Sequence, residues 1–177
     1  MVSLVRAKRD RGAVVPGRPL FFVSCHLPSD DAARHCDILG MNAYPGWYSH
    51  FGEIERGVDF FRGLLRATRA AHPATPLVLT EFGADAVAGL HSCPALMFTE
   101  EYQVEVIMAI IGVLHEPEFE PWVIGEHVWN FADFATTANT MRVVGNRKGV
   151  FTRDRQPKMA ATALRMRWGP AAASETR

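Results

Sequence analysis

One glutamate in the middle of the sequence follows a run of apolar residues. Glu81 comes directly after PLVLT, residues of the kind that fill a buried parallel strand, and it precedes Phe82 and Gly83. No second acid in this run shares the free-energy cost of burying the charge. A β/α-barrel enzyme carries catalytic carboxylates at the carboxyl ends of its strands, and a salt-bridged structural acid can occupy the same position. Position alone therefore leaves Glu81 open to a catalytic or a structural role.

Three other strings contain side chains that could work beside a carboxylate. Tyr44, in MNAYPGWY, could donate a hydrogen bond to one, or it could be a core aromatic residue with a satisfied hydroxyl. Asn146 and Lys148, in GNRKG, lie two residues apart on a glycine-flanked loop, so an amide and an ammonium could face one anion. Standing alone, this string would be a solvated basic turn. Trp129, in VWNFADF, could line a ligand or only fill the core.

Four short apolar runs predict the strands that would position these side chains. Each run is too short for a buried helix, and each is continuously apolar, which is typical of parallel strands covered by helices. Each ends in polar or aromatic residues, which in a β/α barrel converge on the active face. The four runs lie at residues 19–25, 37–42, 76–81 and 121–131.

Helical patterns separate the later runs. Thr99 followed by two glutamates predicts a helix start, Pro117 marks its end, and a last helix is expected to begin near Pro157. The alternation of strands and helices predicts an α/β fold. A complete barrel has eight strands and roughly 250 residues, so the pattern indicates a partial TIM barrel of about four β/α units. The two helical faces consist of Ile54, Val58, Phe61 and Leu65, and of Val104, Ile107, Met108, Ile111 and Leu114.

Composition and charge narrow the classes of protein. The chain has 177 residues, of which 48% are hydrophobic and 21% charged, as in an ordinary globular domain. Its 19 basic and 19 acidic residues balance, so no long-range field favours nucleic acid or an anionic membrane as a partner. No apolar stretch is long enough to span a membrane, and the basic start lacks the apolar core of a signal peptide. These features favour the cytoplasm.

Motifs for cofactors and metals are missing from the sequence. The histidines lack metal-ligand spacing, and the adjacent Glu126 and His127 would point to opposite faces of a strand. Neither a phosphate-binding glycine loop nor a nucleophile elbow occurs, so we expect no cofactor and no metal. Cys25, Cys36 and Cys93 form no CxxC pair, and we interpret them as reduced packing residues.

Five strings, in order and with matching spacing, resemble a known enzyme family. MNAYPGWY, TEFGADAVAGLHS, FTEEYQ, VWNFADF and GNRKGVFTRDRQPK are similar to the β-glucuronidases of glycoside hydrolase family 2, from about Arg18 to Trp168. The resemblance implies the carboxyl-terminal half of a catalytic barrel, retaining hydrolysis of β-D-glucuronides, and a homo-oligomer in full-length form. Two alternatives stay open: a non-catalytic carbohydrate-binding relic, and a hydrolase of a neutral β-glycoside such as a β-galactoside.

The resemblance also implies roles for the chemical side chains. Glu81 matches the nucleophile of a retaining mechanism, and Tyr44 matches the tyrosine that orients it. Asn146 and Lys148 match a pair that binds the C6 carboxylate of the uronic acid, which a neutral sugar would leave without its partner.

Other positions follow from the resemblance with supporting roles. Arg142 and Tyr48 match positions that shape the carboxylate end of the site, and Trp129 would line the sugar face. We expect Asn130 and Asp133 to brace loops, and Gly83 and Gly89 to serve tight turns.

One catalytic group of the family is missing from this sequence. The family places its general acid/base in an Asn-Glu motif well before the NAY string, at a position that would fall before Met1, and the sequence contains no Asn-Glu. We therefore expect a fragment that is inactive as an isolated chain. In this interpretation residues 1–16 are a poorly ordered basic start, 17–170 form the half-barrel, and 171–177 are a flexible tail.

Overall fold

The computed structural model describes residues 18–138, 140 and 144–169. The predicted loose start (1–16), the predicted tail (171–177) and Arg142 lie outside these residues. Each predicted strand is present within a few residues of its apolar run. The elements are β1 (Phe21–Ser24), η1 (Asp31–His35), β2 (Ile38–Asn42), α2 (Ile54–Ala71), β3 (Leu77–Phe82), α3 (Glu100–Leu114), β4 (Val123–Val128) and α4 (Met159–Trp168).

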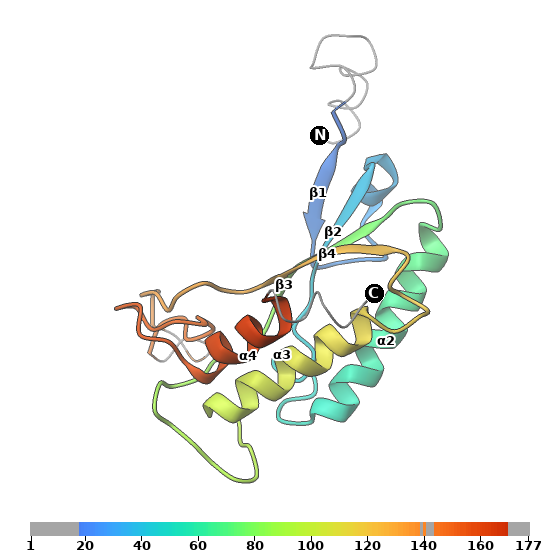
Figure 1. The fold of residues 1–177 in the computed structure, drawn as a ribbon. Helices are drawn as coiled ribbons and strands as arrows, with labels where there is room; N and C mark the ends of the chain where they lie inside the picture. Colours follow the sequence, from blue (N-terminus) through green and yellow to red (C-terminus); the bar gives the residue numbers. More distant parts are fainter. Residues whose placement is uncertain (1–17, 139, 141–143, 170–177) are drawn as a thin grey trace.

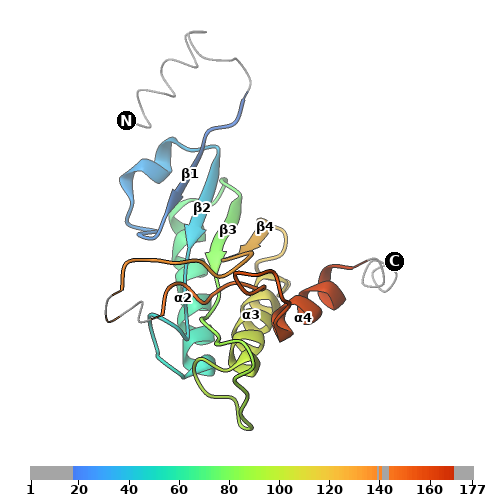
Figure 2. The same cartoon turned by 90° about the vertical axis from the view of Figure 1, so that its left-hand side faces the viewer.

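The strands form one parallel sheet in the order β1-β2-β3-β4. Helices α2, α3 and α4 lie side by side along one face of this sheet (Figures 1 and 2). Sequential parallel strands joined by helices on one side are the arrangement of a β/α barrel. The predicted α/β fold with about four β/α units is therefore confirmed, as an open half of such a barrel.

The core lies between the sheet and the helices. Leu39 and Met41 on β2, and Leu77 and Leu79 on β3, are at most 1% exposed and face the helices. Burying each such side chain stabilises the fold by roughly 1.5–3 kcal/mol. From the predicted helical faces, the fully buried members are Phe61, Leu65, Ile107, Ile111 and Leu114. The predicted Ile54, Val58, Val104 and Met108 are only partly buried, whereas Val106 and Ile110, which were not predicted, are buried.

The helix boundaries follow the predicted signals. The side chain of Thr99 caps α3 by accepting a hydrogen bond from the backbone N–H of Tyr102 at 3.2 Å. Helix α3 ends at Leu114, before Pro117, and α4 begins at Met159, two residues after Pro157. These local signals therefore fix the ends of the helices that flank the sheet.

The opposite face of the sheet is open among the described residues. Val23, Gly40, Val78 and Gly125 stand in one row across the four strands, so valine and glycine alternate along it. A Cβ on Gly40 would lie 2.8 Å from Val23 Cγ2, which shows why β2 carries a glycine beside the large side chains of β1. Val23 is 39% exposed although it is apolar. In a closed barrel such inward-facing side chains form packed layers with those of the opposite strands.

The interpretation of the cysteines is partly wrong. Cys36 is buried, as expected of a packing residue, but Cys25 and Cys93 are exposed because both lie in loops, after β1 and before α3. None of the three cysteines forms a disulfide within the described residues. No helix of the described residues is both long enough and apolar enough to cross a membrane.

Candidate active site

Tyr44 and Glu81 meet at the carboxyl ends of β2 and β3. The Tyr44 hydroxyl donates a hydrogen bond to Glu81 Oε2 at 2.6 Å. Glu81 is the penultimate residue of β3, and Tyr44 follows β2 by two residues. Both side chains are half-buried. The structure thus places the predicted carboxylate and its predicted hydrogen-bond donor in direct contact.

An irregularity in the sheet sets this contact. The pairing of β2 with β3 shifts between Met41 and Asn42, so Asn42 stands opposite Glu81. The backbone N–H of Ala43 donates to the Glu81 carbonyl at 2.9 Å, and the Thr80 hydroxyl donates to Asn42 Oδ1 at 2.7 Å. These bonds tie the two strand ends together and bring Tyr44 beside the Glu81 carboxylate.

Lys148 is enclosed, which excludes the alternative of a solvated basic turn. Its side chain is 0% exposed, and Nζ lies 2.6 Å from Asp85 Oδ2 and 3.1 Å from the Tyr48 hydroxyl. Nζ also lies 4.8 Å from the ring centroid of Trp47, 4.7 Å from that of Tyr48 and 5.6 Å from that of Tyr44. Distances of this size are typical of cation–π contacts.

Asp85 and Trp47 are site residues that sequence reasoning missed. Both lie inside the strings TEFGADAVAGLHS and MNAYPGWY, directly beside predicted residues. An acid two residues after the strand-end Gly83 is the signal that could have suggested a partner for the lysine.

Asn146 is almost fully buried and shapes the loop that carries Lys148. Its Oδ1 accepts a hydrogen bond from the Lys148 N–H at 3.0 Å. Its backbone pairs in both directions with Phe134. Asp85 Oδ1 accepts from the Arg147 N–H at 2.6 Å, so the strand-end segment and this loop are joined by backbone as well as by side chains.

A second buried ion pair braces the same loop. Lys158 Nζ donates to Asp133 Oδ1 at 2.8 Å, and Asp133 Oδ1 also accepts from the Gly149 N–H at 3.0 Å. Burial lowers the pKa of Lys158 below its ordinary value, and the hydrogen bond from Lys158 to Asp133 opposes that shift. Asn130 Nδ2 donates to the Ala132 carbonyl at 2.7 Å. The expected loop-bracing contacts of Asp133 and Asn130 are therefore present.

Trp129 follows β4 and is half-buried, so it is not simply a core residue. Its ring meets Phe134 edge-on at 6.2 Å between centroids, and the backbone N–H of Trp129 donates to the Phe82 carbonyl at 2.9 Å. The chain next to it turns at Gly83, where φ is +142° and a Cβ would lie 2.8 Å from the Trp129 carbonyl oxygen. The expected turn roles of Gly83 and Gly89, whose φ is +78°, fit these values.

The other buried or half-buried carboxylates of the described residues have partners away from Glu81. Asp85 contacts Lys148 and Asp133 contacts Lys158. Glu100 accepts from the backbone N–H groups of Gly89 and Met159, and Glu126 accepts from Trp168 Nε1. Asp30 accepts from the Ser24 hydroxyl and Asp37 from the Leu20 N–H, while Glu101 contacts His91 and Glu116 accepts from Arg62. Within the described part of the chain, no group of three His, Cys, Asp or Glu side chains is placed to hold a metal ion.

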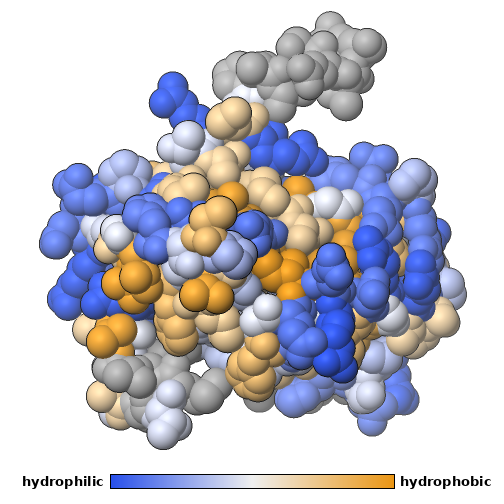
Figure 3. All heavy atoms as spheres, turned by 90° about the horizontal axis from the view of Figure 1, so that it is seen from below, coloured by the Kyte–Doolittle hydropathy of each residue, from blue (hydrophilic) through white to orange (hydrophobic). Residues whose placement is uncertain are grey.

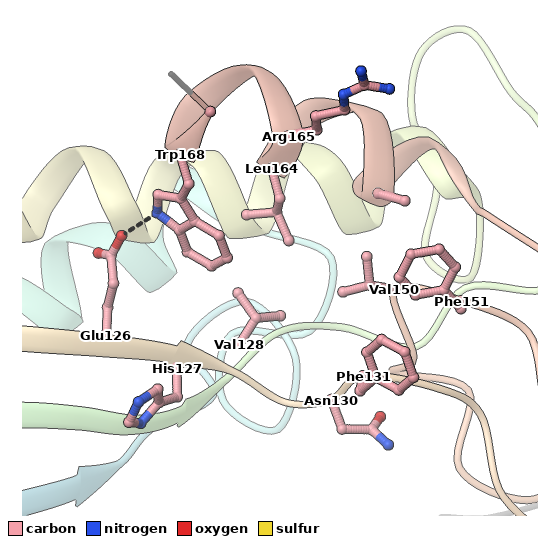
Figure 4. Close-up of a pocket in the computed structure, with 12 residues that line it drawn as sticks. Glu126, His127, Val128, Asn130, Phe131, Val150, Phe151, Leu164, Arg165 and Trp168 are labelled. Atoms are coloured by element: carbon pink, nitrogen blue, oxygen red, sulfur yellow. Dashed lines mark hydrogen bonds between the residues drawn. The ribbon is translucent and has the colours of Figure 1, made fainter. Parts of the chain in front are cut away.

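A separate groove of about 520 Å³ runs between β4 and α4. The Trp168 Nε1–H donates to Glu126 Oε1 at 2.8 Å at one side of the groove (Figure 4). Most of the wall is apolar and consists of Val128, Phe131, Val150, Phe151, Leu164 and Trp168. Glu81 and Lys148 do not line it. This groove therefore belongs to an edge of the half-barrel and not to the candidate site.

The end of the molecule toward which the strands run shows a mixed surface. Hydrophobic residues gather across its middle, and hydrophilic residues lie toward both sides (Figure 3).

Fold and site together define a β/α-barrel domain with a tyrosine-bound carboxylate at the carboxyl end of a strand. The family model of the glycosyl hydrolases family 2 TIM barrel domain matches residues 11–173, and the chain belongs to this family.

Relatives of known name agree with this assignment. A beta-glucuronidase of Paenibacillus borealis is 42% identical over 163 residues, which cover 87% of this chain and 25% of that protein. A beta-glucuronidase of Rattus norvegicus is 41% identical over 161 residues, covering 88% of this chain and 24% of that protein. The chain thus spans about a quarter of the length of the curated relatives it matches.

Solved structures of high similarity carry the same name. The beta-D-glucuronidase of Dictyoglomus thermophilum superposes with a TM-score of 0.80 at 45% identity, covering 86% of this chain and 26% of that one. The beta-glucuronidase of Ruminococcus gnavus in complex with uronic isofagomine gives a TM-score of 0.83 at 41% identity, covering 94% of this chain and 28% of that one.

Proposed function

We propose that this chain supplies the nucleophile and the uronate-binding residues of an enzyme that hydrolyses β-D-glucuronides with retention of configuration. Glu81 is the nucleophile and Tyr44 orients it. In the first step a Glu81 oxygen bonds to the anomeric carbon while the bond to the aglycone oxygen breaks, and a general acid protonates that oxygen. In the second step water hydrolyses the glycosyl ester and returns Glu81 as a carboxylate.

The position of Tyr44 is the observation that carries this proposal. Its hydroxyl lies 2.6 Å from Glu81, and its ring centroid lies 5.6 Å from the Lys148 ammonium. A glucuronide carries its anomeric carbon and its carboxylate on the same six-membered ring, so its site needs a nucleophile and a cation close together. Lys148 is that cation, with Asn146 and Tyr48 beside it, and Trp129 lines the sugar face. Arg142, which the resemblance assigns to the carboxylate end of the site, lies outside the described residues.

The general acid comes from outside the described residues. A retaining mechanism needs a second carboxyl group about 5–5.5 Å from the nucleophile, and the buried and half-buried carboxylates described above have other partners. We propose that the remaining strands of the barrel supply this group. They would pair with the outer edges of β1 and β4, which among the described strands pair only with β2 and β3, and would fill the groove along α4 (Figure 4).

The names of similar proteins support the glucuronide over a neutral substrate. The relatives described above, of about 40% identity, are beta-glucuronidases, and one solved relative binds uronic isofagomine, a carboxylate-bearing sugar mimic. A neutral β-galactoside would leave the buried Lys148 without a substrate partner. A purely carbohydrate-binding relic would have no use for a nucleophile held by Tyr44.

We also propose the setting in which the enzyme works. The balance of 19 basic and 19 acidic residues gives nucleic acid no electrostatic advantage as a partner. The free, exposed thiols of Cys25 and Cys93 suit the reducing cytoplasm. The full-length enzyme is a homo-oligomer.

Covalent labelling tests the proposal. With 2-deoxy-2-fluoro-β-D-glucuronyl fluoride, Glu81 bonds to the anomeric carbon and fluoride leaves with the bonding electrons, so no general acid is needed. We expect peptide mass spectrometry to find the adduct on Glu81 and to find none on this peptide in Glu81→Gln. A neutral control, 2-deoxy-2-fluoro-β-D-glucosyl fluoride, should label more slowly. Absence of the adduct from wild-type protein, or an adduct on another carboxylate, contradicts the assignment.

A further inference from the structure

We propose that Asp85 is a positioning residue that determines the preference for a uronic acid, by holding the Lys148 ammonium where a sugar carboxylate can reach it. This inference rests on the proposed function and adds a residue to it. Asp85, Tyr44, Trp47 and Tyr48 together surround Lys148, and we call these four residues the lysine cage.

The lysine cage is closed and charged. Lys148 and Asp85 side chains are 0% and 5% exposed, and their charged groups are 2.6 Å apart. The three aromatic rings stand 4.7–5.6 Å from Nζ. An ammonium removed from water in this way loses its hydration, and aromatic faces replace only part of it. The Asp85 carboxylate provides the remaining stabilisation before any ligand arrives.

The Asp85 carboxylate is itself fixed in place. Its Oδ1 accepts from the Arg147 N–H at 2.6 Å, one residue before Lys148. The Ala86 N–H donates to the Arg147 carbonyl at 3.0 Å, so the backbone on both sides of this contact is joined. Gln103 Nε2 donates to the Ala84 carbonyl at 2.9 Å and anchors the same segment to α3. Because its own position is fixed by these contacts, Asp85 determines the position of the Lys148 ammonium.

The ammonium keeps capacity for a second acceptor. A lysine has three N–H donors, and the hydrogen bonds that Lys148 Nζ donates to side chains of the described residues are those to Asp85 Oδ2 and the Tyr48 hydroxyl. The third N–H would donate to an oxygen of the sugar carboxylate, which must enter between the walls of the lysine cage because the Lys148 side chain is 0% exposed. Fixing a charged donor in advance reduces the ordering cost that the ligand would otherwise meet.

Asp85 also repels an incoming carboxylate, and this opposing effect is the smaller one. Coulomb energies fall with distance. Asp85 touches the ammonium, whereas the sugar carboxylate must bind the other side of the same ammonium and stays farther from Asp85. Loss of the Asp85 charge should therefore weaken the uronate site more than it relieves the repulsion.

Asp133 provides a matched control on the same loop. Its ion pair with Lys158 is 2.8 Å long, and the two side chains are 2% and 0% exposed. Removing either carboxylate breaks one buried ion pair, but Lys158 makes its contacts with Asp133 and with the carbonyls of Ala86 and Arg147, outside the lysine cage.

The experiment compares labelling rates of Glu81 by the two fluorides introduced above, uronyl and glucosyl. In Asp85→Asn we expect the uronyl-to-glucosyl rate ratio to fall at least about 10-fold below that of wild type, the size of a lost charge-assisted hydrogen bond. In Asp133→Asn any change should affect both rates together, so the ratio should stay within about threefold of wild type. Asp85→Glu, which keeps the charge, should recover part of the ratio.

Each outcome of this experiment supports or overturns a stated claim. An unchanged or increased ratio in a folded Asp85→Asn protein overturns the inference, because Asp85 would then be structural or a competitor of the substrate. An equal fall of the uronyl-to-glucosyl ratio in Asp133→Asn also overturns the inference, because any damage to the loop would then be enough to lower the ratio. If Asp85→Asn does not fold, a ratio for Asp85→Glu equal to that of wild type overturns the inference, and a reduced ratio without a similar reduction in Asp133→Glu supports it. Failure of wild-type protein to prefer the uronyl fluoride would instead contradict the proposed function.

Discussion

The Tyr44 hydroxyl lies 2.6 Å from the Glu81 carboxylate, although 37 residues separate the two along the chain. A hydrogen bond from the phenol fixes the orientation of the carboxylate that would act as the nucleophile. Because the ring of the same tyrosine also faces Lys148, one side chain links the reacting group to the proposed uronate site.

Tyr44→Phe should slow the covalent labelling of Glu81 by roughly 10- to 100-fold, because it removes one hydrogen bond to a charged acceptor. The ring and its contact with Lys148 remain, so the preference for the uronyl over the glucosyl fluoride should persist. Time-resolved mass spectrometry of the labelled peptide measures both quantities. A rate equal to that of wild type would show that Tyr44 does not activate Glu81.

Lys148→Met should remove the preference for the uronyl fluoride, because of the two fluorides only the uronyl one carries a carboxylate that can contact the ammonium. The substitution should also lower the free energy of unfolding by about 3–5 kcal/mol, the cost of removing one member of a buried ion pair. Urea denaturation measures this loss. The double variant Lys148→Met with Asp85→Asn should regain part of the stability but none of the preference.

A loss of stability without a loss of substrate preference would assign Lys148 a different role. If Lys148→Met unfolds more easily yet still prefers the uronyl fluoride, the lysine is structural and the uronate site lies elsewhere.

Gly83→Ala should destabilise the protein by at least about 2 kcal/mol, because an alanine at φ +142° is strained and its Cβ would lie 2.8 Å from the Trp129 carbonyl oxygen. Gly63→Ala in α2 is the control. No atom lies within 4 Å of a Cβ at that exposed helical position, and the change should stabilise the helix by roughly 0.5–1 kcal/mol. Urea midpoints of the two variants should therefore move in opposite directions, and a neutral Gly83→Ala would refute the strain argument.

The purified chain should associate in solution, because β1 and β4 leave backbone edges unpaired within the described sheet and β1 exposes apolar side chains. Phe22→Ser on β1 should reduce this association. Phe51→Ser, in a loop where the side chain is 62% exposed, should not. Light scattering after size-exclusion chromatography gives the molar mass, and a monodisperse wild-type monomer would contradict the open-barrel interpretation.

The sequence by itself determined the elements and the identity of most chemical groups. Apolar runs and helical periods are local properties, so β1 to β4, α2 and α3 could be placed from them. Parallel strands bring their carboxyl ends to one edge, and this rule predicted that the clusters containing Tyr44 and Glu81 would converge, while the family resemblance implied that the two side chains meet.

Only the tertiary structure decided how the charges pair. Asp85 and Lys148 are 63 residues apart, and Asp133 and Lys158 are 25 apart, on segments without regular periodicity. Local patterns show that such residues are charged, but they do not show which partner each one has. Burial is likewise a property of the assembled chain, which is why Lys148 is enclosed while Cys25 and Cys93 are exposed. A buried charge requires a compensating neighbour, and that neighbour is defined only when the segments come together in space.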